Sequence, residues 1–271
     1  MSAEKTLTEK EYRDIPAISR SELFLMAQSP EKFKYARENP SEPTPALLLG
    51  QVFHKMVLQP DTLTDEYAKC ISVDRRTKQG KEEFDKFFDE NKEKIIIGAE
   101  MWEKCSQMAD AVAQNHLAKK LLSGEKEVPF FWTDDLTGEK CKCRADCITQ
   151  IEDMTICVDV KSASDASSDA FMKAAIKHGY DLQAGMYTDG ITRNINKDIR
   201  FVFLIVEKEP PYAINIMQAD ELFVKRGYDL FREYIGMYHE CKQTDNWYGY
   251  LGKSGIINNL GLPAYLAKEI E

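Results

Sequence analysis

The sequence predicts one α/β domain with a helical N-terminal subdomain. Between residues 19 and 122, helix start signals are followed by apolar residues at helical spacing. Three segments between residues 127 and 161 alternate apolar and polar residues and are separated by turn sequences, which is typical of antiparallel strands. Two helical segments and two further strands follow, an order in which helices pack on a sheet.

The first two helices are predicted from their start signals. Ser19 and Glu22 have the spacing of a capping box, so a helix should follow through Ala27. Ser29 repeats the signal with a proline at the first helical position, and a second helix should run to about Glu38. A polar leader to about Ile15 precedes them, and a stiff connection with Pro40, Pro43 and Pro45 follows.

The segment from Ala46 to Leu58 reads as a buried helix because most of its residues are apolar. Gly50 and His54 lie four residues apart and therefore on one face, where the glycine would permit a neighbour to approach closely. His54 is either a hydrogen-bonded core residue or part of a functional site.

The remaining elements follow from the same signals. Residues 61–98 are highly charged and predict a helical excursion with loops, in which Phe84, Phe87 and Phe88 form a packing stripe. Residues 100–122 predict an amphipathic helix that ends at Gly124. The later predictions are strands 127–133, 140–151 and 155–161, helices 169–178 and 180–192, strands 200–207 and 212–217, a helix 219–243, and a tail from Asn246 that is a loop with a short terminal helix.

Length, hydropathy and charge bound the class of protein. With 271 residues, 43% of them hydrophobic, the chain can bury a substantial core. No stretch approaches the roughly 18 apolar residues of a membrane span, and the start lacks a signal-peptide run, so a cytoplasmic protein without membrane contact is expected. The net charge of −9 means that nucleic-acid binding would need local basic patches. The candidates, which are otherwise solvated surface charges, are Arg75, Arg76, Lys78 and Lys81, and Lys140, Lys142 and Arg144.

The seven cysteines should be reduced thiols in a cytoplasmic protein. Cys141, Cys143, Cys147 and Cys157 lie close together in the sequence, but Cys-x-Cys on a strand lacks the turn of a C-x-x-C metal site. Ordinary buried thiols are the favoured interpretation. An iron–sulfur cluster is the alternative.

Asp146, Asp159 and Lys161 are the residues that point to chemistry. Side chains alternate along a strand, so Asp159 and Lys161 project from one face, and Asp146 on the preceding strand can face Asp159. Two converging carboxylates repel each other, which favours a divalent cation between them, Mg²⁺ or alternatively Mn²⁺. Lys161 would then orient a metal-activated hydroxide and share the charge on phosphorus. The alternative is an ordinary Asp–Lys pair on an edge strand.

Gln183 and Tyr187 lie four residues apart and therefore share one face of the following helix. They could hold a DNA strand or Lys161. Their alternative interpretation is ordinary surface polarity.

Taken together, these motifs resemble the PD-(D/E)XK nuclease superfamily, its RecB-like branch, and most of all the RecE-type exonucleases (exodeoxyribonuclease VIII) of prophages. The resemblance is carried by I-S-R-S-E-L-F-L-M-A-Q-S-P-E-K-F, L-L-L-G-Q-V-F-H-K-M-V-L-Q-P, R-A-D-C-I with V-D-V-K-S, and G-Y-D-L-Q-A-G-M-Y. It implies a nuclease core with a mixed central sheet flanked by helices, plus the helical N-terminal subdomain.

The resemblance also implies roles for individual residues. Asp146 and Asp159 would bind the metal together with the backbone carbonyl of Val160, and His54 would be a further possible ligand. Lys161 would be the catalytic lysine.

Other positions would support these groups. Gln183 and Tyr187 would hold the site and the substrate strand. Glu127 matches an acidic position on the first strand of the family, and Glu125 is close enough to leave that choice open.

By the same resemblance, residues 1–124 form a helical region that packs on the core and contributes His54, residues 125–245 form the nuclease core, and residues 246–271 form a C-terminal tail, all within one structural domain.

The implied activity is a Mg²⁺-dependent exonuclease that digests double-stranded DNA from 5′ ends and exposes a 3′ strand for phage-type recombination. A single-strand annealing protein would be its partner, and it would form a homo-oligomer, possibly a ring around DNA. The alternatives are a structure-specific or single-strand endonuclease with the same site, and a non-catalytic DNA-binding or assembly protein that keeps the fold.

Overall fold

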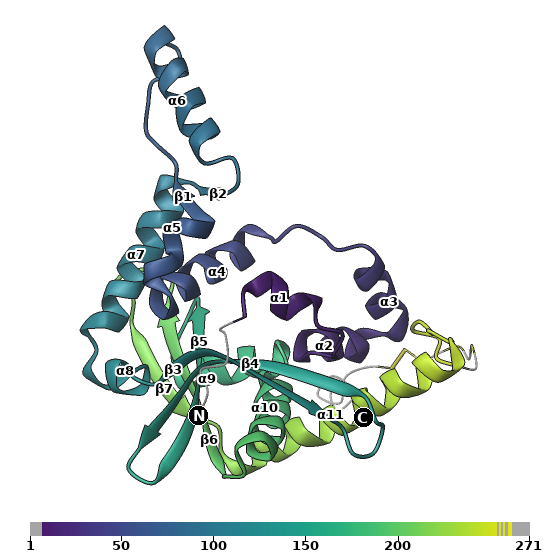
Figure 1. Cartoon of the computed structure of the whole chain (residues 1–271). Coiled ribbons are helices and arrows are strands. Elements are labelled where there is room, and N and C mark those ends of the chain that lie inside the picture. Colours follow the sequence, from purple (N-terminus) through teal and green to yellow (C-terminus); the bar gives the residue numbers. More distant parts are fainter. Residues whose placement is uncertain (1–6, 254, 256, 258–259, 262–271) are drawn as a thin grey trace.

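The computed structural model describes residues 7–253, 255, 257, 260 and 261. Its centre is a five-stranded sheet in the order β3–β4–β5–β6–β7 (Figure 1). The β5–β6 pair is parallel and the other neighbouring pairs are antiparallel, so the sheet is mixed, as the family resemblance implies. The strands are β3 (Glu125–Thr133), β4 (Lys140–Ile151), β5 (Met154–Ala163), β6 (Ile199–Glu207) and β7 (Ile214–Gln218).

Helices flank this sheet, and helices from the N-terminal part of the chain extend the fold beyond it (Figure 1). No helix in the described ranges is long and apolar enough to cross a membrane. The helices are α1 (Glu9–Asp14), α2 (Arg20–Gln28), α3 (Pro30–Glu38), α4 (Pro45–Leu58), α5 (Leu63–Glu66), α6 (Lys78–Glu90), α7 (Ala99–Gln114), α8 (His116–Leu121), α9 (Ser168–Lys177), α10 (Tyr180–Ile195) and α11 (Glu221–Thr244), with a 3₁₀ turn at Pro60–Thr62 and two short strands, β1 (Tyr67–Lys69) and β2 (Ile95–Ile97).

The hydrophobic core lies on both faces of the sheet. One cluster joins the sheet to α4, α7 and α8, and another joins it to α9, α10 and α11. Strand β5 contributes Val158 and Val160 to the first cluster and Cys157 to the second. Because successive side chains point to opposite faces of a sheet, Asp159 and Lys161 project toward α10, between two packed layers.

The N-terminal helix pair begins as its capping signals predict. The main-chain N–H of Ser19 donates to the Glu22 carboxylate at 2.8 Å at the start of α2. The hydroxyl of Ser29 accepts from the N–H of Lys32 at 3.2 Å at the start of α3. Both helices bury apolar side chains against α10 and α11 in a third cluster. The pair is therefore packed on α10 and α11.

Helix α6 forms an arm with β1 and β2 that projects from the body (Figure 1). Phe88 is 52% exposed, and Phe84 is covered by the Arg75 guanidinium, 4.2 Å from its ring centroid. Within the described chain, Phe84, Phe87 and Phe88 join none of the three hydrophobic clusters. The packing role predicted for these phenylalanines is therefore wrong for the body of the protein.

Three other predicted elements differ from the structure. The polar leader contains α1, which begins with a capping box between Thr8 and Glu11. The predicted helix 100–122 is divided, because Asn115 ends α7 and its side chain accepts from the N–H of Ala118 at 3.0 Å to start α8. The predicted terminal helix of the tail lies outside the described residues.

Helices α10 and α11 meet at backbone contact. A Cβ atom at Gly227 would overlap the carbonyl oxygen of Asp181, and one at Gly185 would overlap the main-chain nitrogen of Tyr228. Asp181 is fully buried at this contact and forms an ion pair with Arg226. Only glycine permits this approach, so the position of α10 depends on these two residues.

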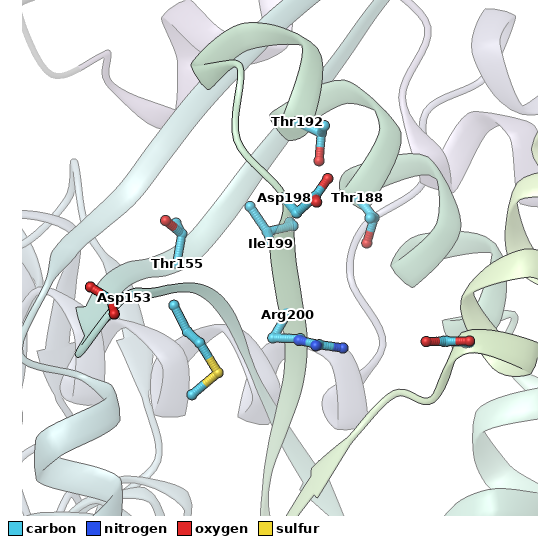
Figure 2. Close-up of a pocket in the computed structure, with 9 residues that line it drawn as sticks. Asp153, Thr155, Thr188, Thr192, Asp198, Ile199 and Arg200 are labelled. Atoms are coloured by element: carbon cyan, nitrogen blue, oxygen red, sulfur yellow. The ribbon is translucent and has the colours of Figure 1, made fainter.

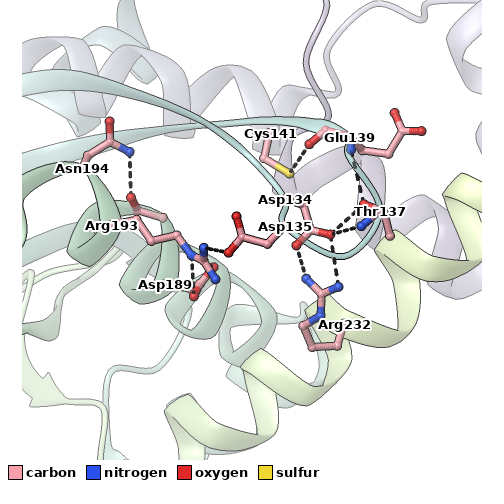
Figure 3. A network of polar contacts seen from close by, with 10 residues as sticks. Asp134, Asp135, Thr137, Glu139, Cys141, Asp189, Arg193, Asn194 and Arg232 are labelled. Atoms are coloured by element: carbon pink, nitrogen blue, oxygen red, sulfur yellow. Dashed lines mark hydrogen bonds and ion pairs between the residues drawn. The ribbon is translucent and has the colours of Figure 1, made fainter.

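The turn of the β3–β4 hairpin is tied to the same two helices by ion pairs (Figure 3). Arg232 of α11 donates two hydrogen bonds to Asp134, and the N–H of Thr137 adds a third at 2.9 Å. Arg193 of α10 pairs with Asp135. Burial alone would raise the pKa of Asp134, but the hydrogen bonds from Arg232 and Thr137 outweigh it and hold the pKa below its usual value.

The cysteines of β4 and β5 are interior thiols, as predicted. Cys141, Cys143, Cys147 and Cys157 are at most 1% exposed and form no disulfide. Burial raises the pKa of each of the four thiols. They therefore pack as small apolar side chains.

Replacing Gly227 by alanine should destabilise the protein, because the added Cβ overlaps the Asp181 carbonyl oxygen. Overpacking of this kind costs about 1–3 kcal/mol, and urea unfolding should show a correspondingly lower free energy of unfolding. The control is Gly236→Ala on the same helix, where a Cβ meets nothing within 4 Å. That change should stabilise the protein by up to about 1 kcal/mol through helix propensity. Equal effects of the two substitutions would contradict the close approach of α10 and α11.

Replacing Asp134 by asparagine should lower the melting temperature at neutral pH and have little effect in acid. A carboxylate whose pKa falls on folding contributes stability above its unfolded pKa of about 3.9, and this stability is lost as the pH falls through the folded pKa. Thermal unfolding curves of wild type and variant should therefore converge below about pH 4. A difference that stays constant into acid would show that the ion pair with Arg232 is not its source.

Candidate active site

The candidate site lies where β4 and β5 separate. The two strands pair from Ile151 with Met154 up to Cys147 with Val158, and within the described strands the pairing stops there. Strand β4 then continues along β3, and its far part also forms an isolated bridge between Cys141 and Ile18. We call this point, between Asp146 on β4 and Val160 on β5, the strand fork.

Asp146 takes the place of the missing strand partner. Its Oδ2 accepts a hydrogen bond from the main-chain N–H of Val160 at 2.7 Å, which satisfies a group that the ladder leaves open. A strand residue directs its N–H and C=O to the same side, so the Val160 carbonyl also points toward the fork. His54 of α4 lies against the same carboxylate, with 3.5 Å between its Nδ1 and Oδ2 of Asp146.

Asp159 is held from the α10 side of the fork and is 2% exposed. The Lys161 ammonium lies 2.6 Å from its Oδ2, and the side-chain amide of Gln183 donates to its Oδ1 at 2.5 Å. Burial raises the pKa of Asp159, the charge of Lys161 lowers it, and the charge of Asp146 raises it, with a net increase. Burial therefore outweighs the attraction of Lys161, and the second carboxylate adds to the increase.

Lys161 also contacts Tyr180, a residue that the sequence prediction did not include. The Lys161 Nζ lies 4.8 Å from the centroid of the Tyr180 ring. Tyr180 is the first residue of α10, three residues before Gln183 and seven before Tyr187. This spacing places all three on one helix face, which is the signal that could have identified it.

Tyr187 lies one turn after Gln183 and packs against Phe201, with 6.1 Å between ring centroids. Burial raises the pKa of its hydroxyl well above the usual value, with further contributions from Cys143, Tyr12 and the two site aspartates. The structure therefore places Gln183 against Asp159 and Tyr187 in the adjoining apolar wall.

Glu127 stands opposite Asp146 at an interruption of the β3–β4 ladder. Its φ angle of 54° lies in the left-handed region, a conformation that costs a non-glycine residue about 1–3 kcal/mol. The Arg144 Nε lies 2.6 Å from the Glu127 carboxylate. Glu125 is exposed and keeps its place in the ladder. Of the two glutamates considered, Glu127 is the one beside the strand fork.

The interpretation of Lys142 as a solvated surface charge of β4 is wrong. Lys142 is 5% exposed, and its ammonium donates to the carbonyl oxygens of Tyr12, Arg13 and Ile15 at 2.8–3.0 Å. Lys142 therefore anchors the end of α1 to the sheet, where a cation is favoured by the helix dipole.

The prediction that a neighbour approaches closely at Gly50 is wrong, because a Cβ at this position would meet nothing within 4 Å. No neighbour approaches closely there among the described residues. The side of α4 that leads to His54 therefore has open space beside Gly50.

The donor set at the fork suits a magnesium-type ion. Asp146 and Asp159 supply carboxylate oxygens, and the Val160 carbonyl points to the same place. Among the described residues, no group of three or more His, Cys, Asp or Glu side chains is arranged to hold a metal ion by itself. Mg²⁺ keeps several waters and is bound by one or two carboxylates plus substrate phosphates, so it does not need a protein cage.

A pocket of about 430 Å³ lies at the other end of β5 and β6 (Figure 2). Thr155 and Ile199, which are ladder partners, line its floor, whereas Asp159 lies four residues further along β5. At the rise of a strand this is about 13 Å away. The charged lining residues are Asp153, Asp198, Glu221 and Arg200. With three carboxylates to one guanidinium, this pocket does not suit a phosphate, and the candidate site is the strand fork.

Among solved structures, the chain is similar to the crystal structure of a putative exonuclease from Eubacterium rectale. The match covers 97% of this chain and 98% of that chain, with a TM-score of 0.64 and 15% sequence identity, which shows a shared fold. A second structure, of SSO0001, covers 83% of this chain and 77% of that chain at 13% identity, but its TM-score of 0.39 is too low to support an argument. No curated protein matches the chain significantly.

A family model covers most of the chain. The model, described as a PDDEXK-like domain of unknown function (DUF3799), matches residues 17–259. This range includes α2, α4, the strand fork and α10, and therefore every residue placed at the fork above. The predicted PD-(D/E)XK superfamily is thus confirmed at the level of the fold. The chain belongs to the DUF3799 family of PDDEXK-like domains.

Proposed function

We propose that this protein is a metal-dependent deoxyribonuclease that hydrolyses phosphodiester bonds, with Mg²⁺ as its metal and Mn²⁺ as a substitute. The observation that carries the proposal is the convergence of Asp146, Asp159 and Lys161 at the strand fork. Membership of a PDDEXK-like family supports the nuclease class.

Each group at the fork has a distinct role in this proposal. Asp146, Asp159 and the Val160 carbonyl would hold the metal, which when bound supplies an activated hydroxide and a counter-charge for the phosphate. Gln183 fixes the orientation of Asp159 through its hydrogen bond. Lys161, held by Asp159, places its ammonium where it can balance the negative charge that develops on the phosphate oxygens in the transition state.

Three further residues would support these groups. His54 would orient Asp146 or bind the metal directly from α4. Glu127 would add an acid on the β3 side of the fork. Tyr187 would form the wall behind Gln183 that keeps water away from Asp159.

The finer activity in this proposal follows the resemblance to RecE-type exonucleases. The protein would digest duplex DNA from 5′ ends and leave a 3′ single strand for an annealing protein in prophage recombination. A homo-oligomer, in ring form, would let an acidic chain surround DNA with locally basic surfaces. A cytoplasmic location would give it access to that substrate.

Lys161→Ala and Asp159→Ala should each reduce Mg²⁺-dependent hydrolysis of linear duplex DNA by roughly 10²-fold to 10³-fold or more, because each removes a charge needed in the transition state. Lys173→Ala, an exposed lysine on α9, is the matched control and should keep wild-type activity. Circular dichroism and thermal melting check that the variants fold.

Cleavage by either site variant at nearly the wild-type rate would contradict the mechanism. A wild-type protein that binds DNA but does not hydrolyse it with Mg²⁺ or Mn²⁺ would instead support a non-catalytic DNA-binding protein.

The mode of cleavage should depend on free DNA ends. The wild-type protein should degrade linear duplex DNA and leave covalently closed circles intact, whereas an endonuclease would open the circles. A label at the 5′ end of one strand should be released early and a label at the 3′ end late. A chelator should stop both reactions, and added Mg²⁺ should restore them. Early release of the 3′ label would reverse the proposed polarity.

A further inference from the structure

We propose that Arg20 is a positioning residue of the active site, which clamps the turn between α9 and α10 and thereby holds Tyr180 against Lys161. The proposal rests on the nuclease function above and gives the N-terminal helix pair a role at the strand fork. Three sets of contacts carry it.

The first set joins Arg20 to the turn. Its guanidinium donates to the carbonyl oxygen of His178 and, at 3.3 Å, to that of Gly179. His178 is the C-cap of α9, so the first of these bonds satisfies a carbonyl group beyond the end of the helix and places a cation at its negative end. The Gly179 carbonyl also accepts the N–H of Gln183 at 3.2 Å, so the second bond joins Arg20 to the first turn of α10. Gly179 has a φ of 64°, which lets the chain turn sharply into α10.

The second set consists of aromatic contacts around Arg20. Its guanidinium carbon lies 5.2 Å from the ring centroid of Phe24 and 5.7 Å from that of Tyr180, within the range of a cation–π interaction. The Phe24 ring also fills the space that a Cβ at Gly179 would occupy. Helix α2 is therefore in direct contact with the turn through two of its residues.

The third set connects the turn to the catalytic groups. The Tyr180 ring lies 4.8 Å from the Lys161 Nζ and is packed between Phe171 and Phe203, with centroid distances of 5.9 and 6.0 Å. The same helix carries Gln183, which holds Asp159. A loosened turn would therefore displace a contact of Lys161 and a hydrogen bond of Asp159 together.

The Arg20 guanidinium is bonded to main-chain carbonyl oxygens of the protein itself. Burial lowers the pKa of Arg20, while Tyr187 and Asp159 raise it, with a net decrease. The competing role is direct contact with a DNA phosphate, and the two roles predict different kinetics.

Steady-state hydrolysis of linear duplex DNA tests the clamp. Arg20→Ala should lower kcat by about 10-fold to 100-fold and leave KM nearly unchanged, because small misplacement of catalytic groups has this effect. Arg20→Lys should recover part of the loss, since a lysine keeps the charge but cannot donate as a planar fork to two carbonyls. Arg200→Ala is the control, because Arg200 is exposed and lines the pocket at the other end of β5 and β6.

Variants of the rings test the same clamp if Arg20→Ala does not fold. Tyr180→Leu and Phe24→Leu should each lower kcat, because each removes a ring that the Arg20 guanidinium contacts. Wild-type kcat in both substitutions would overturn the proposal.

The salt dependence of DNA binding, measured without metal, separates the clamp from a phosphate contact. If Arg20 positions Lys161, the slope of log K against log salt concentration should be the same in wild type and Arg20→Ala. If Arg20 binds a phosphate, the slope should fall by about 0.9 and KM should rise. A reduced slope with unchanged kcat would overturn the proposal.

Nuclear magnetic resonance of lysines labelled at Cε gives a measurement that does not depend on activity. The Lys161 methylene signal should be displaced by the Tyr180 ring and is assigned by its loss in Lys161→Arg. In Arg20→Ala it should move toward the signals of exposed lysines, and in Arg200→Ala it should stay. An unchanged signal in Arg20→Ala would overturn the clamp. A wild-type protein without hydrolysis would defeat the proposed function alone, because this measurement would still decide the clamp.

Discussion

The arrangement of the site depends on one hydrogen bond that takes the place of a strand pair. Where β4 leaves β5, the N–H of Val160 would be unsatisfied, and the Asp146 carboxylate accepts it at 2.7 Å. This single contact fixes Asp146 beside Asp159 and turns the Val160 carbonyl toward both. One more pair of the ladder would satisfy the backbone equally well and would remove the site. The sheet is thus incomplete at the position where chemistry requires free oxygen ligands.

The groups around the fork are held by parts of the chain that are distant in sequence. His54 comes from α4, and Gln183 comes from α10. Helix α10 is itself located by backbone contact with α11 at Gly227 and by the hydrogen bonds of Arg20 to the turn before it. Helices α2 and α11 therefore stabilise the site without contributing a side chain to the strand fork. This explains how a short set of polar residues can keep its geometry in a predominantly apolar interior.

Local signals allowed much of the fold to be predicted. The capping residues Ser19 and Ser29 gave both helix starts, and alternation gave the strands that carry Asp146 and Asp159, because these patterns depend on neighbours in sequence. The strand fork could not be predicted, since the end of a ladder depends on pairing register. The interior position of Lys142 and the contacts of Tyr180 depend on α1 and α2, which pack there from far along the chain. Likewise, the exposure of Phe88 on α6 could not be seen in a pattern that also describes core helices.

The thiols on the strands of this fold, which would be soft metal ligands, are buried in the core, whereas the carboxylates, which are hard ligands, meet at the strand fork. Cys157 lies two residues before Asp159 and is fully enclosed, and burial raises its pKa well above the usual value. The thiolate is the species that alkylating agents, oxidants and soft metals attack. In the described part of the chain, Cys70 alone among the cysteines is not buried, and it lies on the segment next to the arm. Reagents that modify sulfur would therefore reach the periphery first, while the thiols of β4 and β5, the two strands that carry the carboxylates, stay unmodified.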